Sequence, residues 1–329
     1  MSASSDQRVT FVDENDCRIE SFELASPGPG EVRIRNIASL VSAGTELAVL
    51  RKRHRAFASG GEAAAQFRYP FHPGYAAVGI VESIGRNVTG FSAGDMVWHP
   101  GPHATGAVMP VDRCLAVPTG IEARDAVFFG LAQIAMTAIR RAPVALGDSV
   151  LVSGLGLVGI LVGSLYQLAG ARVAAADFSP GRRARAAMFG FDPVIDLKST
   201  SLVDWYSERP DSRPDVAIEA AGIEANIEAC MKAARQGGRV VLQGSPRKPM
   251  EIDPYTDIHR KGLTLIGAHD GTVSAEVRQK DVPYLFSLCA GPLRIENIRT
   301  HEFAFDQAPI VYDRVETDLD EYLGVVLTY

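Results

Sequence analysis

Three glycines, Gly154, Gly156 and Gly159, follow a short apolar run in the spacing G-x-G-x-x-G, and Asp177 ends the next apolar run. In this arrangement the first glycine allows a tight turn, the second lets the backbone approach a ligand closely, and the third lets the following helix pack on the strand. The N-terminus of that helix would bind a pyrophosphate, and Asp177 would accept hydrogen bonds from ribose hydroxyls. The spacing therefore predicts a site for a dinucleotide.

Strand and helix patterns surround these glycines in the order that such a site requires. Residues 150–153 and 172–176 predict strands, and residues 157–169 have the length of a helix. Two other structures fit parts of the pattern: a membrane span, since residues 150–171 carry no charge, and a glycine-rich turn in an α/β protein without a nucleotide. Five glycines interrupt the stretch, and strand-like and helix-like parts alternate within it, which favours the dinucleotide site.

Composition and charge are those of an ordinary globular protein. The chain has 329 residues, of which 47% are hydrophobic and 22% charged, and its net charge is −6. This acidic balance argues against a nucleic-acid partner and against an anionic membrane surface. The first ten residues are polar, unlike a signal peptide, and the four cysteines form no C-x-x-C pair, so we expect a reduced, cytoplasmic protein.

The elements that must position the site change in character along the chain. Residues 8–130 are β-rich, with short β-branched runs between turn clusters. From residue 121 helices and strands alternate, beginning with one helix over residues 122–142, and a later helix should start at Ser179 and Pro180. Alternation of this kind predicts an α/β fold with a parallel sheet covered on both faces. The later strands are expected at Val194–Asp196, Val216–Glu219, Val240–Gln243 and Leu263–Ile266.

A basic segment, Leu47–Phe67, lies within the β-rich part and carries its charges at residues 51–55. A solvated face of a helix or loop is the simpler interpretation, because runs of charge usually have that origin. A binding site for an anionic group of a substrate is the alternative, and both interpretations stay open at this point.

Motifs in order along nearly the whole chain are similar to those of the medium-chain dehydrogenase/reductase superfamily, which includes alcohol dehydrogenases and quinone oxidoreductases. They are PGPGEVRIR at 27–35, SAGTE at 42–46, PGYAAVGIVESIG at 73–85, GFSAGDMV at 90–97, GLGLVG at 154–159, EAAG at 219–222, QGGRVVLQG at 236–244 and the closing GVVLTY. The resemblance implies a GroES-like catalytic domain, residues 1–130 and 269–329, interrupted by a Rossmann dinucleotide-binding domain, residues 131–268. It also implies an active site in the cleft between the domains, and a homodimer formed through the edge of the nucleotide-domain sheet.

The chain departs from the zinc-dependent members of this superfamily at each position of the catalytic metal. Ala43 stands where they carry a cysteine, and Tyr75 follows a Pro-Gly pair where they carry a histidine. Gly-Leu-Ala-Gln occupies residues 130–133, where the third ligand falls. The four-cysteine lobe of the structural zinc is missing as well, since Cys114 is alone in that region. Without a ligand set, we expect no zinc at either site.

Two histidines, His99 and His103, are four residues apart and invite a metal hypothesis. They lack helical context and a third ligand, so we do not expect a metal there. The pairing of AGTE with PGY instead resembles a zinc-less branch of the superfamily, which includes bacteriochlorophyllide dehydrogenases and enzymes of polysaccharide and secondary metabolism.

Hydride transfer without a metal requires a hydrogen-bonding group beside the reacting oxygen. By resemblance, Thr45 occupies the position of a proton-relay hydroxyl, Tyr75 that of the lost histidine, and Glu46 an acidic position beside it. We expect Tyr75 to be the proton donor or acceptor, with Thr45 and Glu46 assisting. Each has a structural alternative: Tyr75 would fill the vacated pocket, Thr45 would cap backbone, and Glu46 would bind loop amides. His269, with Asp270, is the second-choice acid–base candidate.

The residues expected to bind the cofactor favour NAD over NADP, because the carboxylate of Asp177 would repel the additional phosphate of NADP. Arg182 matches a basic position that contacts the ribose in NAD-dependent relatives, and together with Arg183 it keeps NADP as the second candidate. Gly324 stands where relatives often carry a basic residue directed toward the pyrophosphate. The other residues expected to bind the cofactor are Leu157, Val158, Gly244, Ser245 and Ala268.

The hypothesis is a zinc-independent, NAD(P)-dependent oxidoreductase that transfers hydride between nicotinamide and a secondary alcohol or ketone of a specialised metabolite. One alternative is an NADPH-dependent enoyl or quinone reductase, and another is a nucleotide-binding protein without turnover. The expected partner is a small-molecule substrate, with neither nucleic acid nor membrane.

Overall fold

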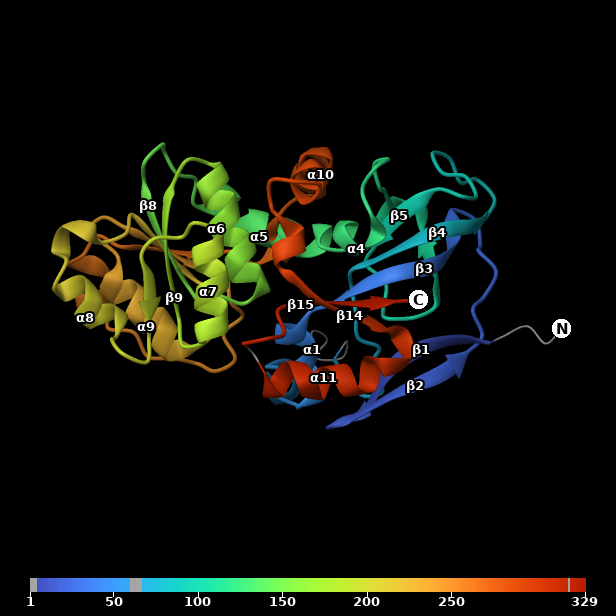
Figure 1. Ribbon diagram of the computed structural model, residues 1–329, viewed down its shortest axis with the longest axis horizontal. Helices are drawn as coiled ribbons and strands as arrows, with labels where there is room; N and C mark the ends of the chain where they lie inside the picture. The colour runs from blue at the N-terminus through green and yellow to red at the C-terminus, as the bar shows by residue number, and fades with distance from the viewer. Residues whose placement is uncertain (1–4, 60–66, 319) are drawn as a thin grey trace. The chain divides into compact units, whose positions relative to one another are not determined.

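The computed structural model describes residues 5–59, 67–318 and 320–329, which form two compact units (Figure 1). Unit 1 runs to Gly130 and resumes at Phe286, whereas unit 2 comprises Leu131–Leu285. The chain thus returns to unit 1 at residue 286 rather than at the expected residue 269. The physical reason is that Asp281, in helix α10 (Ala275–Cys289), forms an ion pair with Arg140 of helix α5 (Phe129–Arg141), which ties this segment to unit 2.

Unit 2 contains a six-stranded parallel sheet in the order β10-β9-β8-β11-β12-β13. This is the order of a Rossmann fold, with the switch in direction between β8 and β11. Every strand predicted from the sequence in this unit is present, with ends that differ by at most one residue. The strands are β8 (Ser149–Ser153), β9 (Arg172–Asp177), β10 (Val194–Asp196), β11 (Val216–Glu219), β12 (Arg239–Leu242) and β13 (Thr264–Gly267).

Helices cover both faces of this sheet. Those that follow α5 are α6 (Leu157–Leu168), α7 (Pro180–Met188), α8 (Leu202–Ser207) and α9 (Glu224–Ala233), and Figure 1 shows α6 and α7 beside β8 and β9. Helices α8 and α9 pack against Leu151, Ala217 and Val240. Because side chains alternate between the faces of a sheet, and Val150 and Val152 are buried as fully as Leu151, the opposite face is covered as well.

The helix predicted to begin at Ser179 and Pro180 is α7. Ser179 is its N-cap, and the Ser179 hydroxyl accepts the N–H of Arg182 at 3.0 Å. Pro180 occupies the first turn, where its missing N–H leaves no bond unmade.

The single helix expected over residues 122–142 is wrong, because the structure divides it into α4 (Ala123–Ala126) and α5. Helix α4 ends in a 3₁₀-type hydrogen bond, in which the N–H of Phe128 donates to the carbonyl of Asp125, three residues earlier. The local tightening ends the first helix before the second begins.

The uncharged stretch at residues 150–171, for which a membrane span was one alternative, contains most of β8, the glycine turn and α6. Among the residues that the structure describes, no helix has both the length and the apolar character needed to cross a bilayer.

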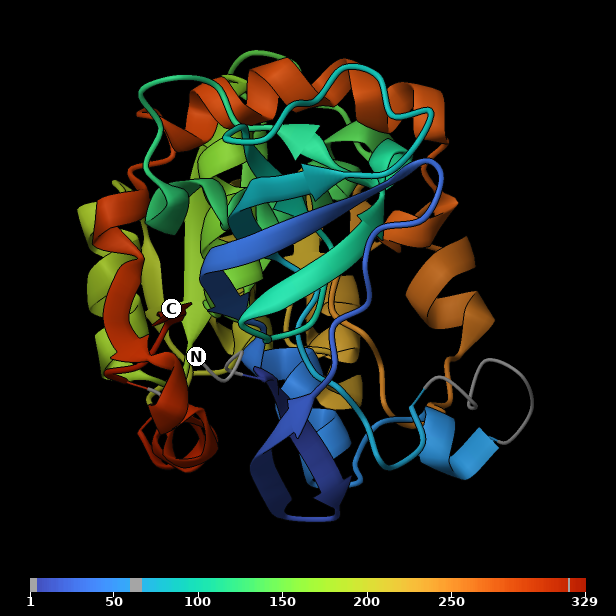
Figure 2. The same cartoon turned by 90° about the vertical axis from the view of Figure 1, so that its right-hand side faces the viewer.

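Unit 1 is β-rich, as predicted for residues 8–130. A two-stranded sheet pairs β1 with β2, and a seven-stranded sheet has the order β14-β15-β3-β4-β5-β7, with β6 also paired to β3. These strands are β1 (Asp6–Asp13), β2 (Asp16–Phe22), β3 (Glu31–Val41), β4 (Ala77–Ile84), β5 (Met96–His99), β6 (Gly106–Pro110), β7 (Leu115–Ala116), β14 (Arg299–Ala304) and β15 (Gly324–Thr328). Figure 2 shows the β1–β2 hairpin in dark blue, apart from the strands of the larger sheet. Because β15 pairs with β3, segments from both ends of the sequence build one sheet.

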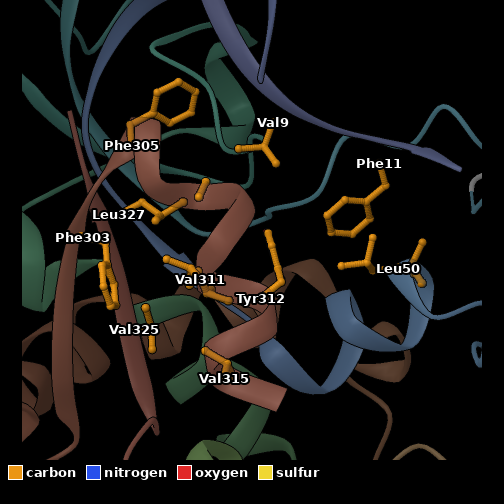
Figure 3. Close-up of a cluster of buried hydrophobic side chains, with 13 residues drawn as sticks. Val9, Phe11, Leu50, Phe303, Phe305, Val311, Tyr312, Val315, Val325 and Leu327 are labelled. Atoms are coloured by element: carbon orange, nitrogen blue, oxygen red, sulfur yellow. The ribbon is translucent and has the colours of Figure 1, made fainter. Parts of the chain in front are cut away.

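Helix α11 (Ala308–Thr317) closes a hydrophobic core against the hairpin, the C-terminal strands and helix α1 (Ala43–Leu50) (Figure 3). Val311, Tyr312 and Val315 face this core at helical spacing. The rings of Phe11 and Tyr312 meet edge to face, with centroids 5.1 Å apart. Tyr312 is fully buried, so its hydroxyl needs a partner inside the protein, and Glu46 of α1 supplies it.

The basic segment Leu47–Phe67 continues from α1 into α2 (Ala56–Ser59), and its residues 60–66 lie outside the described part of the chain. Arg51 forms ion pairs of 2.6 Å with both Asp313 and Glu316, and Arg53 lies 3.0 Å from Glu316. These two arginines therefore hold the end of α1 to α11, which supports the structural interpretation of their charge.

Candidate active site

The G-x-G-x-x-G turn leads from β8 into α6. Gly154 has φ +98°, a conformation that side chains disfavour, and a Cβ there would lie 2.9 Å from the nitrogen of Ala221. A Cβ at Gly159 would lie 2.0 Å from the carbonyl oxygen of Gly154, so turn and helix can pack closely only with glycine at this position. Gly156 is different, because its φ is −66° and a Cβ there would meet no atom within 4 Å. The open space at Gly156 suits the close approach of a pyrophosphate.

Leu157 and Val158 form the start of α6, directly after Gly156. The N–H groups of a first helical turn have no acceptor within the helix, and the helix dipole adds positive charge there. This end of α6 therefore fits the phosphates of a dinucleotide.

Two further glycine turns adjoin Gly154 at the ends of the neighbouring strands. Gly222 follows β11 with φ +70°, and a Cβ there would lie 2.5 Å from the carbonyl oxygen of Ser245. A Cβ at Gly244, after β12, would lie 2.3 Å from the nitrogen of Gly222. Gly154 thus lies against Ala220 and Ala221, and the adjoining Gly222 lies against Gly244 and Ser245. Gly222 is not among the site residues predicted from the sequence, although it ends the EAAG motif.

Asp177 ends β9 beside this turn, and its side chain is buried. Its carboxylate accepts the N–H groups of Leu155 at 2.7 Å and Ser179 at 2.8 Å, which fixes its orientation. Contact with a ribose stays a prediction. Arg183 lies 2.9 Å from Asp196, and it also donates to the carbonyl oxygens of Asp177 and Phe178, so its charge is already engaged.

Two other positions of the expected cofactor site are explained in part by packing. Ala268 follows β13, is buried, and donates its N–H to the carbonyl of Leu242 at 3.0 Å. Its contact with a cofactor stays a prediction. At Gly324 of unit 1, a Cβ would lie 2.3 Å from the carbonyl oxygen of Ile298, so this position has no room for the basic side chain that relatives carry.

In unit 1, Tyr75 lies beside Ser42, the residue that precedes α1. The hydroxyl groups of Tyr75 and Ser42 are in hydrogen-bond contact. Gly74 has φ +100°, and a Cβ there would lie 2.6 Å from the backbone nitrogen of His103, so glycine is required for the turn that carries Tyr75. Ser42 is not among the site residues predicted from the sequence, although it is the first residue of the SAGTE motif.

Glu46 points inward from α1 and is 1% exposed. Its Oε1 accepts the N–H of Ser42 at 3.1 Å, and its Oε2 accepts the hydroxyl of Tyr312 at 3.0 Å and lies 3.3 Å from Nε2 of His103. Burial raises the pKa of Tyr312 well above its ordinary value, and the nearby Glu46 raises this pKa further, so Tyr312 remains a donor. The bond to the N–H of Ser42 is the contact to a loop amide that we gave as the structural alternative for Glu46, and Ser42 in turn links Glu46 to Tyr75.

The remaining two catalytic candidates lie in less favourable places. Thr45 is half-buried in the first turn of α1, and among the described residues its hydroxyl has no hydrogen-bond partner. The side chain of His269 is 76% exposed, and its Nδ1 accepts the N–H of Gly271 at 3.0 Å, which caps a short turn. The roles of both residues stay predictions, and neither is as well positioned as the pair of Tyr75 and Ser42.

The positions that correspond to the zinc ligands do not fit a metal. Ala43 has no ligand atom, and the hydroxyl of Tyr75 is bonded to Ser42. A Cβ at Gly130 would lie 2.9 Å from the ring of Trp98, so no longer side chain has room there. Within residues 5–59, 67–318 and 320–329, no three His, Cys, Asp or Glu side chains are grouped to hold a metal.

His99 and His103 have separate partners. Burial, assisted by the charge of Arg113, lowers the pKa of His99 to about 3, so its ring is neutral. Nδ1 of His99 accepts the N–H of Gly101 at 3.2 Å, which leaves the ring proton on Nε2 to donate to Asn36 Oδ1 at 2.8 Å. His103 instead contacts Glu46.

Comparison with known protein families covers most of the chain with two models. The model described as zinc-binding dehydrogenase matches residues 158–288, and the model described as alcohol dehydrogenase GroES-like domain matches residues 28–155. A sorbitol dehydrogenase from Arabidopsis thaliana is 26% identical in an alignment that covers 92% of this chain and 89% of the relative.

Solved structures share the fold over nearly the whole chain. A protein from Sinorhizobium meliloti, described as a zinc-binding dehydrogenase and bound to NADP, has a TM-score of 0.85 at 19% identity, covering 99% of this chain and 100% of that one. An alcohol dehydrogenase from Escherichia coli complexed with NADH has a TM-score of 0.85 at 20% identity, with the same coverage. The chain belongs to the medium-chain dehydrogenase/reductase superfamily, as an NAD(P)-dependent oxidoreductase of the alcohol-dehydrogenase type.

Proposed function

We propose that the chain interconverts a secondary alcohol and a ketone of a specialised metabolite without a catalytic zinc, and that Tyr75 moves the proton. The observation that carries this proposal is the contact between the hydroxyls of Tyr75 and Ser42 at the position where relatives hold the metal. Ala43 has no atom that could bind zinc, and Gly130 has no room for a longer side chain, so both argue against a set of zinc ligands. The substrate class is supported by the resemblance of the AGTE and PGY motifs to the zinc-less branch.

When bound, the nicotinamide supplies hydride acceptor and donor chemistry. In the oxidative direction, Oη of Tyr75 would accept the hydroxyl proton of the substrate. The phenol of Tyr75 would pass its own proton to Oγ of Ser42, and the Ser42 hydroxyl would pass its proton to water. Tyr75 therefore need not become charged. Reduction reverses each transfer. Glu46 fixes Ser42 by accepting its N–H.

The proposed cofactor is NAD rather than NADP. The carboxylate of Asp177 is fixed at the end of β9, where it would repel a 2′-phosphate, and Arg183 is occupied by Asp196. We expect NADH to bind at least about tenfold more tightly than NADPH in a fluorescence titration, a difference of about 1.4 kcal/mol. Equal affinity would refute the preference for NAD, and tighter binding of NADPH would assign NADP as the cofactor. If the carboxylate of Asp177 causes the preference, Asp177→Ser should narrow the difference in affinity between the two cofactors.

The reaction is tested by incubating the purified protein with NAD or NADP and the products of enzymes encoded beside it, followed by mass spectrometry. A loss or gain of two hydrogens at an alcohol or ketone is the expected result. Reduction of an activated alkene with carbonyls left intact would point to an enoyl reductase, and tight nucleotide binding without turnover on any compound would point to a sensor. Either outcome would replace the present proposal.

The role of Tyr75 is tested with Tyr75→Phe and a matched tyrosine. We expect Tyr75→Phe to lower kcat by at least about 100-fold, the usual range for loss of a general acid or base. Tyr69 is the control, because it is also half-buried in unit 1 but donates to the carbonyl of Val49. Tyr69→Phe should leave kcat within about twofold. A Tyr75→Phe enzyme with the rate of the parent would remove Tyr75 from the mechanism.

We also propose that the protein forms a homodimer through β13. This strand pairs with β12 on one side, and in the described part of the sheet no strand lies on its other side. An open edge of this kind can pair with a second copy. Sedimentation of the purified protein tests this, since a monomer at micromolar concentration would exclude it.

A further inference from the structure

A chain of buried polar side chains runs through unit 1 to Glu46. Beyond Nε2 of His103, which lies 3.3 Å from Glu46, Nδ1 of His103 is 2.7 Å from Oγ of Ser39. Ser39 Oγ is in turn 2.7 Å from the hydroxyl of Tyr329. With the ring proton on Nε2, His103 donates to Glu46 and accepts from Ser39, so each hydroxyl in the chain has a consistent role. Each group in the series therefore donates to the next one, and the last acceptor is the carboxylate of Glu46.

Three members of this network are almost completely buried. His103 and Ser39 have no exposed surface, and Glu46 is 1% exposed. Buried polar groups stabilise a fold little compared with apolar side chains of the same shape, but a fully bonded network fixes side chains in one arrangement. The group that this network fixes most directly is Glu46, which in turn holds the N–H of Ser42.

Two paths of bonded groups link His103 to Tyr75. On the side of the hydroxyl, the path runs from His103 through Glu46 to Ser42, whose Oγ contacts Tyr75. On the side of the backbone, the N–H of His103 donates to the carbonyl of Pro73 at 2.8 Å, next to the crowded glycine that precedes Tyr75. The hydroxyl of Tyr75 is therefore linked to His103 through Ser42 and Glu46, and its backbone is linked to His103 through Pro73.

Ser39, His103 and Glu46 are bonded in the order of a Ser-His-acid catalytic triad, but the environment of Ser39 does not suit a nucleophile. Ser39 is fully buried, and its Oγ is bonded to both His103 and Tyr329. A substrate carbonyl has no access to such a hydroxyl, so these residues do not form an acyl-transfer site.

We propose that His103 is a positioning residue, which acts through Glu46 and Ser42 to hold the hydroxyl of Tyr75 at one place. The inference rests on the proposed function in so far as Tyr75 moves the proton. A displacement of about 1 Å at a reacting group can cost up to about 100-fold in rate, so the loss of His103 should lower kcat rather than raise KM.

The first test needs no substrate. The protein is labelled with ¹³Cζ-tyrosine, and the signal of Tyr75 is assigned from its absence in Tyr75→Phe. His103→Asn keeps a polar group near Ser39 but cannot reach Glu46, so we expect the Tyr75 signal to shift or broaden. His103→Gln places its amide near the position of Nε2 and should restore the signal. His99→Asn is the matched control, because His99 is equally buried but bonds Asn36, and it should leave the Tyr75 signal in place.

The second test uses the rate once a substrate is known. We expect His103→Asn to lower kcat about tenfold with little change in KM, and His103→Gln to recover most of the loss. In a Tyr75→Phe background, His103→Asn should have less than about a twofold further effect, because the group that it positions is gone. Folding of each variant is checked by circular dichroism, and Glu46→Asp replaces His103→Asn if the latter does not fold.

The outcomes separate this inference from the proposed function. An unchanged Tyr75 signal in a folded His103→Asn protein overturns the positioning role, whatever the rate. An equal shift in His99→Asn overturns it too, since any buried histidine would then act alike. Full activity of Tyr75→Phe instead overturns the proposed proton transfer, while a shifted Tyr75 signal would still support the link to His103.

Discussion

Two glycine-to-alanine substitutions in the glycine turn should have different effects, one on cofactor binding and the other on stability. Gly156→Ala adds a methyl group where no protein atom lies within 4 Å, whereas Gly159→Ala adds one 2.0 Å from the carbonyl oxygen of Gly154. The first should spare the fold and hinder the cofactor. The second should damage the fold itself.

The expected effect of Gly156→Ala on stability is close to zero. Its φ of −66° suits alanine, and replacing glycine stabilises by about 0.4–1 kcal/mol through the unfolded chain. Alanine is a poorer N-cap than glycine, however, which costs a few tenths to about 1 kcal/mol. The two terms offset each other, so the free energy of unfolding should change by less than about 1 kcal/mol.

Gly159→Ala should lower the free energy of unfolding by about 2 kcal/mol or more. A separation of 2.0 Å is well inside van der Waals contact, and the obstacle is backbone rather than a flexible side chain. Overpacking of this kind costs about 1–3 kcal/mol, and occasionally more.

Cofactor affinity separates the two substitutions. The added methyl group of Gly156→Ala occupies the space that suits the pyrophosphate, so the Kd for NADH should rise about 10- to 100-fold, or about 1.4–2.7 kcal/mol. Urea denaturation measures the stability of both variants, and NADH fluorescence measures the affinity. Unchanged affinity in Gly156→Ala would refute the assignment of the phosphate site, and equal destabilisation by both variants would refute the packing argument.

Three further predictions concern stability and metal content. The pKa of His99 is lowered from 6.5 to about 3, so the folded protein holds this ring neutral while the unfolded chain takes up a proton below pH 6.5. The stability that His99 contributes is therefore complete above pH 6.5 and is lost as the pH falls toward 3. Between pH 7 and pH 5, the free energy of unfolding should fall by about 2 kcal/mol from this group. His99→Gln should therefore lose less stability than the parent over this interval in urea titrations, and parallel losses would contradict the assigned pKa. Arg51→Ala should destabilise by about 1 kcal/mol, since that side chain is 13% exposed and bonds two carboxylates, whereas Arg53→Ala, at 66% exposure, should cost less than about 0.5 kcal/mol. Purified protein should contain substoichiometric zinc and keep its activity after treatment with a chelator, whereas one zinc per chain, lost together with activity, would disprove the metal-free mechanism.

Much of unit 2 could be predicted because its signals are local. Short apolar runs form β8 to β13 within a residue of their expected ends, and Ser179 with Pro180 fixes the start of α7. Glycine at positions 154 and 159 is required by a turn and a contact that lie within six residues of each other. Such features depend on neighbours along the chain, and the sequence presents those directly.

The candidate catalytic group could be predicted only in part, because its partners are distant in sequence. The sequence identified Tyr75 and Glu46 through their motifs, but Ser42 contacts Tyr75 across 33 positions and Tyr312 contacts Glu46 across 266. His103 was considered only for a metal. A buried hydroxyl or carboxyl group bonds whichever partner the packed strands bring within about 3 Å, and no local pattern encodes that choice.

The sequence by itself therefore determined the dinucleotide turn, the alternation of strands and helices, and the absence of ligand residues at the zinc positions. Tertiary structure alone decided that Glu46 holds Ser42 rather than Tyr75, that Gly324 has no room for a side chain, and that Arg51 is tied to α11. The physical reason is the range of the interactions: backbone conformation and hydrophobic periodicity are set by neighbouring residues, whereas buried hydrogen bonds and close packing depend on segments that meet only when the chain has folded.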